Sequence, residues 1–97
     1  MASSVDYLNY VLDLLREVSG ISFKKMMGEY ILYKNNIIFG GIYDNRFLIK
    51  KSESTDELGL NEAIPYPGGS AMFLLDIENA DEIKDIVDNF VRDLQKR

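Results

Sequence analysis

The fold is decided by the central stretch ISFKKMMGEYILYKNNIIFGGIYDNRFLIK, residues 21–50. It contains four short runs rich in Ile, Phe, Tyr and Leu, at residues 21–27, 29–34, 37–43 and 46–50. Gly28 and the pairs Asn35-Asn36 and Asp44-Asn45 separate these runs. Asn and Asp tolerate the positive φ of a tight hairpin turn, so the stretch predicts an antiparallel meander. Gly28 is either a third turn or only a bend within one long strand.

A helix is predicted on the N-terminal side of this stretch. Apolar residues recur there at the three-and-four spacing of an amphipathic helix, namely Tyr7, Leu8, Val11, Leu12, Leu15 and Val18. Ser3 or Ser4 can accept hydrogen bonds from the free amides of the first turn. Gly20 stands where a left-handed C-terminal cap is expected.

A short helix, a strand and a final helix are predicted on the C-terminal side. The short helix is expected near residues 55–61, where Ser54 and Glu57 have the spacing of a capping box. Two prolines then interrupt regular structure, and residues 71–77 are expected to form a buried strand. Asn79 and Glu82 repeat the capping-box spacing. They open a final helix with the apolar stripe Ile83, Ile86, Val87, Phe90, Val91 and Leu94.

This order of elements predicts a two-layer α+β domain. We expect one antiparallel sheet of about five strands, with the helices packed on one of its faces. The 97 residues allow one domain, residues 1–97, and a hydrophobic content of 46% supports one core. Several strands are apolar on both faces, as Tyr30, Ile31 and Leu32 illustrate. The uncovered face therefore needs a partner, and we expect a homodimer or a complex with another protein.

Composition excludes several classes of chemistry. The chain has no cysteine and no histidine, which removes disulfides, thiolate metal sites and the commonest general base. We predict no metal site, no cofactor and no catalytic residue, and we expect that the protein is not an enzyme. A carboxylate pair such as Glu29 and Asp76 is the remaining alternative for acid–base catalysis. With no signal-peptide pattern and no apolar run long enough to cross a membrane, a cytoplasmic protein is expected.

The net charge of −5 is unevenly distributed along the chain. Residues 21–51 carry six basic and two acidic side chains, whereas residues 52–97 carry eleven acidic and four basic ones. Direct DNA binding is disfavoured, because the acidic C-terminal part repels phosphate. A local basic surface on the segment 24–51 stays open as an alternative, and a small anionic ligand or a nucleic acid could bind there.

The succession of motifs between residues 26 and 73 resembles the N-terminal domain of the TfoX/Sxy competence-regulator family. The matching blocks are MMGEYILY at residues 26–33, FGGIYDNRFLIK at 39–50, IPY at 64–66 and the Met72-Phe73 strand. The resemblance implies a fold like that of type III secretion chaperones, with the order α-β-β-β-α-β-β-α. It also implies a role in the transcriptional regulation of competence. Longer members carry a second, C-terminal domain, and we expect this chain to be a standalone N-terminal domain.

Six residues are candidates for a binding site, namely Gly28, Glu29, Asp44, Arg46, Lys50 and Tyr66. Gly28 and Glu29 lack the sequence context of a phosphate-binding loop, so a turn, a bulge or close strand packing is the favoured interpretation of that glycine. Asp44 begins a turn, where its carboxylate can accept hydrogen bonds from amides two residues further on.

The basic and aromatic candidates allow two interpretations each. Arg46 and Lys50 share one face of a strand with Leu48, as either an anion-binding stripe or a solvated surface. Tyr66 and the other tyrosines serve either in packing or as a stacking platform. The sequence favours a non-catalytic, regulatory, protein-binding module over a binder of small anions or nucleic acid.

Overall fold

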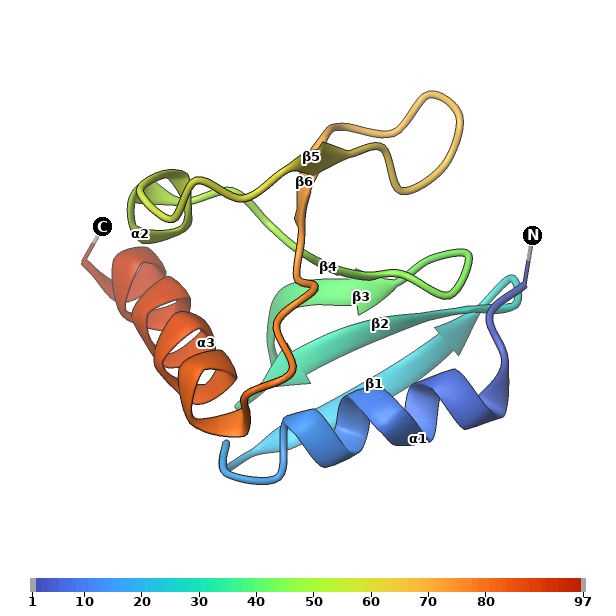
Figure 1. Cartoon of the computed structure of the whole chain (residues 1–97), viewed down its shortest axis with the longest axis horizontal. Coiled ribbons are helices and arrows are strands. Elements are labelled where there is room, and N and C mark those ends of the chain that lie inside the picture. The colour runs from blue at the N-terminus through green and yellow to red at the C-terminus, as the bar shows by residue number, and fades with distance from the viewer. Residues whose placement is uncertain (1, 97) are drawn as a thin grey trace.

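The computed structural model describes residues 2–96 and shows an α+β domain (Figure 1). Its elements are α1 (Val5–Leu14), β1 (Ile21–Met26), β2 (Glu29–Lys34), β3 (Ile37–Ile42), β4 (Phe47–Ile49), α2 (Glu53–Asp56), β5 (Glu62–Ala63), β6 (Met72–Leu74) and α3 (Ala80–Gln95). The predicted fold class is confirmed. The described chain forms six strands rather than about five, because four strands precede α2 where the resemblance implied three.

All six strands belong to one antiparallel sheet with the order β1-β2-β3-β4-β6-β5. The first four strands are neighbours in sequence and in space, as the predicted meander requires. β1 forms one edge of the sheet and the two-residue β5 forms the other. The strand predicted at residues 71–77 is shorter in the structure, since β6 ends at Leu74 and an irregular segment leads from there to α3.

Three two-residue turns join the strands of the meander. Their central residues are Met27-Gly28, Asn35-Asn36 and Asp44-Asn45, and all six have a positive φ. Positive φ at both central residues is the type I′ geometry, which matches the natural twist of paired strands. Gly28, with φ +83°, is therefore part of a turn and not a bend within one strand. Around the last turn, Tyr43 and Arg46 exchange two backbone hydrogen bonds of 3.0 Å.

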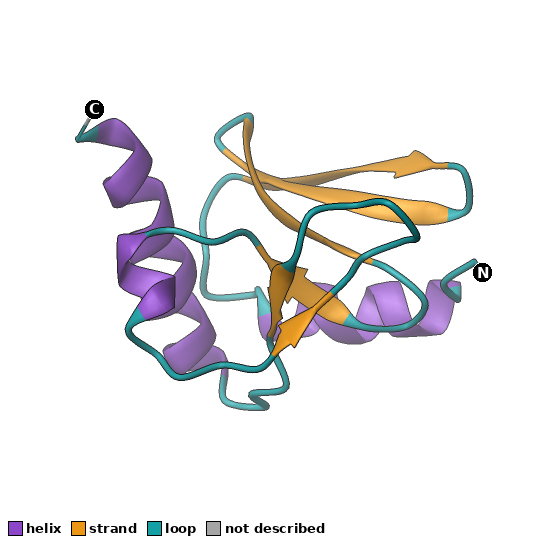
Figure 2. Ribbon diagram, turned by 90° about the horizontal axis from the view of Figure 1, so that it is seen from above, coloured by secondary structure: helices purple, strands orange, loops and turns teal. Residues whose placement is uncertain are grey.

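The two long helices, α1 and α3, pack against one face of the sheet (Figures 1 and 2). Apolar side chains of both helices and of β2, β3, β4 and β6 form one buried cluster, which includes Leu8, Val11, Leu32, Phe39, Phe47, Ile49, Phe73, Ile83, Val87 and Phe90. The apolar stripe predicted for the last helix lines this core, with Leu94 partly buried at its end. The core therefore lies between the sheet and two helices, as a two-layer domain requires.

The ends of the long helices follow the predicted caps in part. The side chains of Ser4 and Asn79 each accept a hydrogen bond of 3.0 Å from the amide three residues further on, as N-caps do. At its other end α1 stops at Leu14, earlier than predicted. Gly20, with φ +75°, leads into β1 instead of capping the helix.

The short helix α2 is displaced from its predicted position. Its capping box consists of Ser52 and Thr55, not of the predicted pair Ser54 and Glu57. The amide and hydroxyl of Ser54 donate instead to the carboxylate of Asp93 on α3, at 2.8 and 2.5 Å. The carboxylate of Asp93 thus engages the serine that the sequence suggested as the cap.

Gly40 lies where the backbones of β3 and β4 approach closely. A Cβ atom at this position would lie 2.2 Å from the carbonyl oxygen of Leu48, a backbone atom that cannot rotate away. We predict that Gly40→Ala lowers the free energy of unfolding by about 3 kcal/mol, the upper end of the usual cost of overpacking because a backbone atom cannot move aside, as measured by urea titration.

Gly68→Ala is the matched control, because an added Cβ there meets no atom within 4 Å. Its positive φ should cost about 1 kcal/mol. Equal losses for the two variants would contradict the close approach of β3 and β4.

Candidate functional site

Four of the six candidate residues lie together at the surface. Glu29, Asp44, Arg46 and Tyr66 line a pocket of about 320 Å³. They come from three places, the start of β2, the β3–β4 turn (residues 43–46) and the loop 64–71 that joins β5 to β6. Residues 64, 65 and 67 of that loop complete the lining. The fold therefore assembles these four candidates from positions far apart in the sequence.

Lys50 lies in a neighbouring cleft of about 420 Å³, together with Ile38, Tyr43 and residues of the loop 64–71. Pro65 and Tyr66 line both depressions, so Arg46 and Lys50 belong to adjoining parts of one surface. Gly28 lines neither depression. Its carbonyl oxygen accepts a hydrogen bond of 3.0 Å from the Ser3 amide. Gly28 therefore holds the N-terminal segment and does not line the candidate site.

Glu29 is engaged in internal hydrogen bonds. One carboxylate oxygen accepts from the Ser3 hydroxyl at 2.5 Å, and the other accepts from the backbone amide of Asp44 at 2.9 Å. The Ser3 oxygen accepts in turn from the Asn45 amide at 3.0 Å, and the Asn45 side chain accepts from the Ser4 amide at 2.9 Å. Glu29 therefore joins the N-terminal segment to the β3–β4 turn. No described group donates to the Asp44 carboxylate, so the hydrogen bonds predicted for it do not form.

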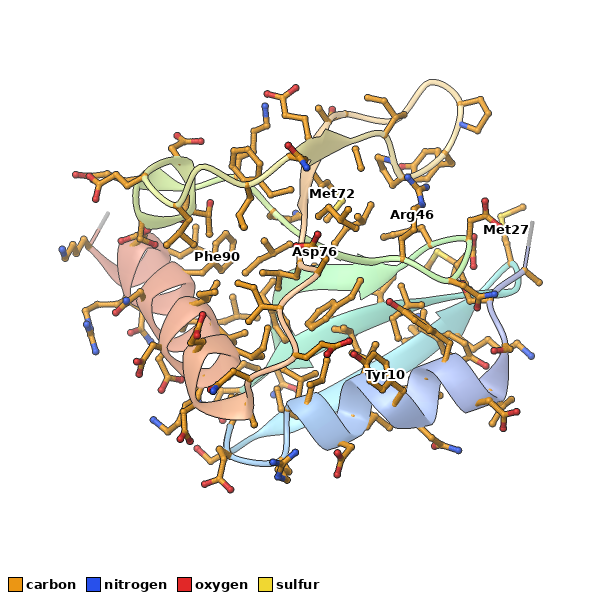
Figure 3. All side chains as sticks on the ribbon, viewed as in Figure 1. Tyr10, Met27, Arg46, Met72, Asp76 and Phe90 are labelled. Atoms are coloured by element: carbon orange, nitrogen blue, oxygen red, sulfur yellow. The ribbon has the colours of Figure 1, made fainter. Side chains whose placement is uncertain are left out.

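Arg46 fastens the loop 64–71 to the sheet. Its Nε donates to the carbonyl oxygen of Tyr43 at 3.1 Å, and its Nη2 donates to the carbonyl oxygens of Ile64 and Pro65 at 3.0 and 3.3 Å. Figure 3 shows Arg46 between the β3–β4 turn and this loop. Pro65 is buried against the sheet, whereas Ile64 is 50% exposed and Tyr66 57% exposed. The guanidinium thus positions a loop that displays two apolar side chains.

The sheet face opposite the helices, here called the open face, is only partly covered. Leu48 is completely buried there, outside the main core cluster, because the loop 64–71 folds over this part of the sheet. Ile38 remains 38% exposed on the same face. Its position follows from a register shift between Leu32 and Tyr33, after which Ile38 pairs with Tyr33. The run Ile37-Ile38-Phe39 gives no sequence signal for that shift, so Ile38 was not among the predicted site residues.

Tyr43 and Tyr66 form an aromatic pair above the open face. Their ring centroids lie 6.0 Å apart with an interplanar angle of 53°. The Tyr43 ring lies back over Gly41, where an added Cβ would meet its Cε2 atom at 2.7 Å. Burial raises the pKa of the Tyr43 hydroxyl, and the neighbouring Tyr66 and Glu29 raise it further. The Tyr43 ring therefore stays neutral, and the pair presents aromatic rings with polar tips, a common property of binding surfaces.

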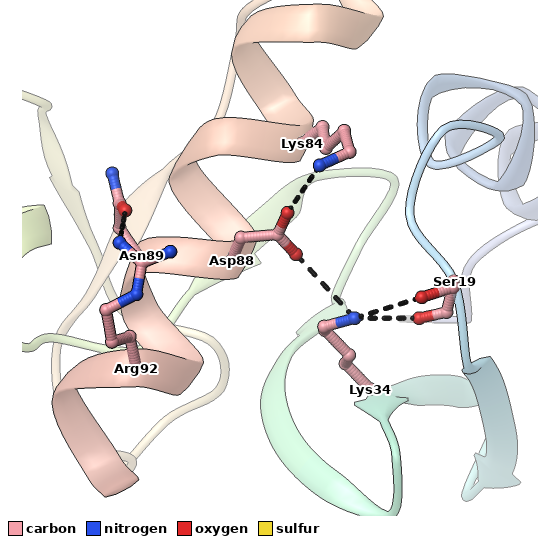
Figure 4. A network of polar contacts seen from close by, with 6 residues as sticks. All are labelled: Ser19, Lys34, Lys84, Asp88, Asn89 and Arg92. Carbon is pink, nitrogen blue, oxygen red and sulfur yellow. Dashed lines mark hydrogen bonds and ion pairs between the residues drawn. The ribbon is translucent and has the colours of Figure 1, made fainter. Parts of the chain in front are cut away.

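The basic residues of the segment 24–51 do not form one continuous surface. Lys34 contacts Asp88 at 3.6 Å and donates to the carbonyl oxygen of Ser19 at 3.0 Å, while Lys84 holds the other oxygen of Asp88 at 2.7 Å (Figure 4). This network joins the sheet to α3. Lys51 pairs with Glu62 at 2.6 Å.

The side-chain ammonium groups of three other lysines of the segment make no hydrogen bond or ion pair with any residue in the described range 2–96. Lys24 and Lys25 lie on the edge strand β1, and Lys50 lies just after β4. Two strands separate these positions in the sheet. The structure thus divides the basic residues that are adjacent in the sequence.

A second polar cluster lies between α2 and α3 and was not predicted. One oxygen of Asp93 accepts from the Ser52 hydroxyl at 2.7 Å as well as from Ser54. These hydrogen bonds lower the pKa of Asp93 to about 2. Beside the cluster lies a groove of about 330 Å³ that includes Leu58 and Ile86. Because the partners lie about 40 residues apart, no local sequence pattern indicates this site.

The sequence leaves a pair of carboxylates, Glu29 and Asp76, as the remaining alternative for acid–base catalysis. Glu29 is held by Ser3 and Asp44, and Asp76 is exposed after β6 and lines neither of the two depressions (Figure 3). Between residues 2 and 96, no group of three or more acidic side chains is placed to hold a metal ion. None of the helices in the described part of the chain is long and apolar enough to cross a membrane.

The lowered pKa of Asp93 gives a prediction for stability. The ionised carboxylate stabilises the folded state at neutral pH, and this contribution is lost as the pH falls from about 4 to about 2. We therefore predict that Asp93→Asn lowers the melting temperature at pH 7, and that most of the difference from the wild type is lost as the pH falls through about 2. Asp85→Asn, an exposed change on the same helix, is the control. A constant difference between pH 7 and pH 2 would contradict the assignment.

Comparison with known proteins places the chain beside one curated relative. No protein-family model matches the sequence. The uncharacterized 12.7 kDa protein in trpE 5'region of Spirochaeta aurantia is 31% identical over 91 residues, which cover 90% of this chain and 79% of the relative. Such identity over nearly the full length of the domain shows common descent. The chain therefore belongs to the same protein family as this uncharacterized spirochaete protein.

Proposed function

We propose that the protein is a non-catalytic regulatory module that acts in the cytoplasm by binding another protein through its open face. The carrying observation is the exposure of Ile38, Ile64 and Tyr66 around the loop 64–71, at 38%, 50% and 57%. Apolar side chains gathered on one surface and rimmed by polar groups are typical of protein-binding sites. The resemblance to the TfoX N-terminal domain adds the expectation that the partner belongs to the machinery of transcription or competence.

The arrangement of the site favours a protein over a small anion. Arg46 and Glu29 are engaged in internal hydrogen bonds, which leaves Lys50 as the cation of the cleft without a partner in the described chain. The side chains of Tyr43 and Tyr66 offer a flat, amphipathic contact area, and they lose little conformational entropy on binding. A broad surface with one lysine suits a protein contact better than the enclosure of a small charged ligand.

When no other protein is present, we propose that a second copy of the chain binds to the open face and forms a homodimer. Around a two-fold axis, Ile38 and Tyr66 of each copy would meet the same residues of the other copy, which is the contact geometry of most homodimers. We predict a dimer at tens of micromolar, the range of ordinary micromolar affinity, in sedimentation experiments. The double substitution Ile38→Asp and Tyr66→Asp should give a folded monomer that still unfolds cooperatively, with a melting temperature that no longer depends on protein concentration.

The same variants test capture of a partner by affinity purification from the host. We expect that Ile38→Asp and Tyr66→Asp lose the co-eluting protein, whereas Leu58→Asp keeps it. Leu58 is a matched control, since it is 46% exposed but lies beside α2 and α3. An unchanged set of captured proteins together with an unchanged mass in solution would reject the open face as the binding site. Nucleic acid co-eluting with the wild type would favour the alternative of a basic binding segment.

A further inference from the structure

β1 is a long and free edge of the sheet. It has six residues, and the side chains of residues 22–26 are all exposed. Within the described chain its one neighbour is β2, so its outer side faces solvent. A free edge of this length presents unpaired backbone groups to which another strand can bind. β5, the opposite edge, has only two residues and is too short for this.

The hairpin geometry decides which backbone groups point outward. The two-residue turn closes on the pair Met26 and Glu29, so Met26 exchanges hydrogen bonds with β2. Hydrogen-bonded and non-hydrogen-bonded pairs alternate along an antiparallel ladder. The backbone groups of Lys24 and Ser22, two and four residues before Met26, therefore also form hydrogen bonds with β2. The outward N–H and C=O groups are those of Ile21, Phe23 and Lys25.

The side chains of this edge determine which partner it can accept. Lys24 and Lys25 point to opposite faces of the sheet, because successive strand residues alternate, and neither has an ion-pair partner between residues 2 and 96. Phe23 and Met26 beside them are each 46% exposed, and Met27 in the turn is 97% exposed. The edge thus combines three outward backbone positions with two unpaired positive charges and apolar neighbours.

We propose that the outer edge of β1 binds an extended acidic segment of a partner protein, which adds to the sheet as a seventh strand. Two adjacent carboxylates of that segment lie opposite Lys24 and Lys25, and its flanking apolar residues contact Phe23 and Met26. This inference rests on the proposed protein-binding function. It adds a second surface, with a stated ligand chemistry, to the open face.

Charge distinguishes this occupant from a second copy of the chain. Two copies paired through β1 would bring the lysines of both together along one seam, and like charges facing each other destabilise such a pair. Edge lysines therefore prevent self-pairing while they attract an acidic strand. A membrane surface would use the lysines and Met27 but would offer no strand to pair with the outward backbone groups of Phe23 and Lys25, which would stay hydrated.

The experiment uses the full chain and a short synthetic peptide with two adjacent glutamates flanked by alternating valine and threonine. We expect binding below about 1 mM, a level that one added strand can reach, in an NMR titration. Hydrogen exchange should slow at the amides of Ile21, Phe23 and Lys25, which bond outward, and stay unchanged at Ser22 and Lys24. The pattern of alternate amides is specific to strand addition.

Charge variants complete the test. The double substitution Lys24→Glu and Lys25→Glu should weaken binding of the acidic peptide at least tenfold and create binding of the matching peptide with two lysines. Lys50→Glu, on the open face, is the charge-matched control and should leave peptide affinity unchanged. Equal affinity for the double variant, no binding by the wild type, or slowed exchange confined to the open face would overturn the proposal. Binding to anionic phospholipid vesicles without binding to the peptide would overturn it as well.

The two proposals fail separately. If the peptide does not bind but Ile38→Asp and Tyr66→Asp still lose the host partner, the β1 proposal is wrong and the proposed function stands. If the peptide binds to β1 while those substitutions change neither the captured partner nor the mass in solution, the open face is not the binding site and the proposal for the β1 edge stands.

Discussion

The register imposed by three two-residue turns is the constraint on which the surfaces of this protein depend. Side chains alternate between the two faces of a strand, so a slip of one residue would exchange the core face for the open face. Five residues other than glycine adopt a positive φ in these turns, at a cost of roughly 1 kcal/mol each. Four of them are Asn or Asp, which bear this conformation best, and the fifth, Met27, stands at a fully exposed tip. Pairing of the strands and burial of Leu32, Phe39 and Phe47 offset the cost.

Two charged residues that the sequence suggests as ligand-binding groups instead form internal hydrogen bonds that join separate segments of the chain. Glu29 joins the N-terminal segment to the β3–β4 turn, and Arg46 joins that turn to the loop 64–71. Arg46 thereby holds the loop that carries Tyr66 at the open face, whereas Glu29 fixes the turn from which Arg46 extends. A buried Pro65 next to an exposed Tyr66 shows how the loop is anchored on one side while it displays the other.

Local patterns predicted the elements, and long-range pairing determined the rest. Asn35-Asn36 and Asp44-Asn45 specify tight turns because of their own conformational preferences, and the stripe of α3 follows from its own period. The sequence around α2 has capping-box spacing at Ser54 and Glu57, whereas the observed cap is Ser52, and both serines donate to Asp93, about 40 residues away. The position of Ile38 depends on a register shift that no short pattern encodes. Glu29, Asp44, Arg46 and Tyr66 could be chosen from the sequence, but their assembly into one surface required the tertiary structure.

The chain is basic in residues 21–51 and acidic beyond, and the fold places these two groups of charges on different parts of the molecule. Among the described residues 2–96, the lysines of this basic part that form no ion pair lie on the β1 edge and beside the open face, while α3 with its acidic residues packs on the other face of the sheet. The most direct test of a protein-binding role is hydrogen–deuterium exchange on the wild-type protein, alone and in its complex purified from the host. The account predicts slowed exchange in β1, β3 and the loop 64–71. Protection confined to α2 and α3, or no protection at all, would contradict it.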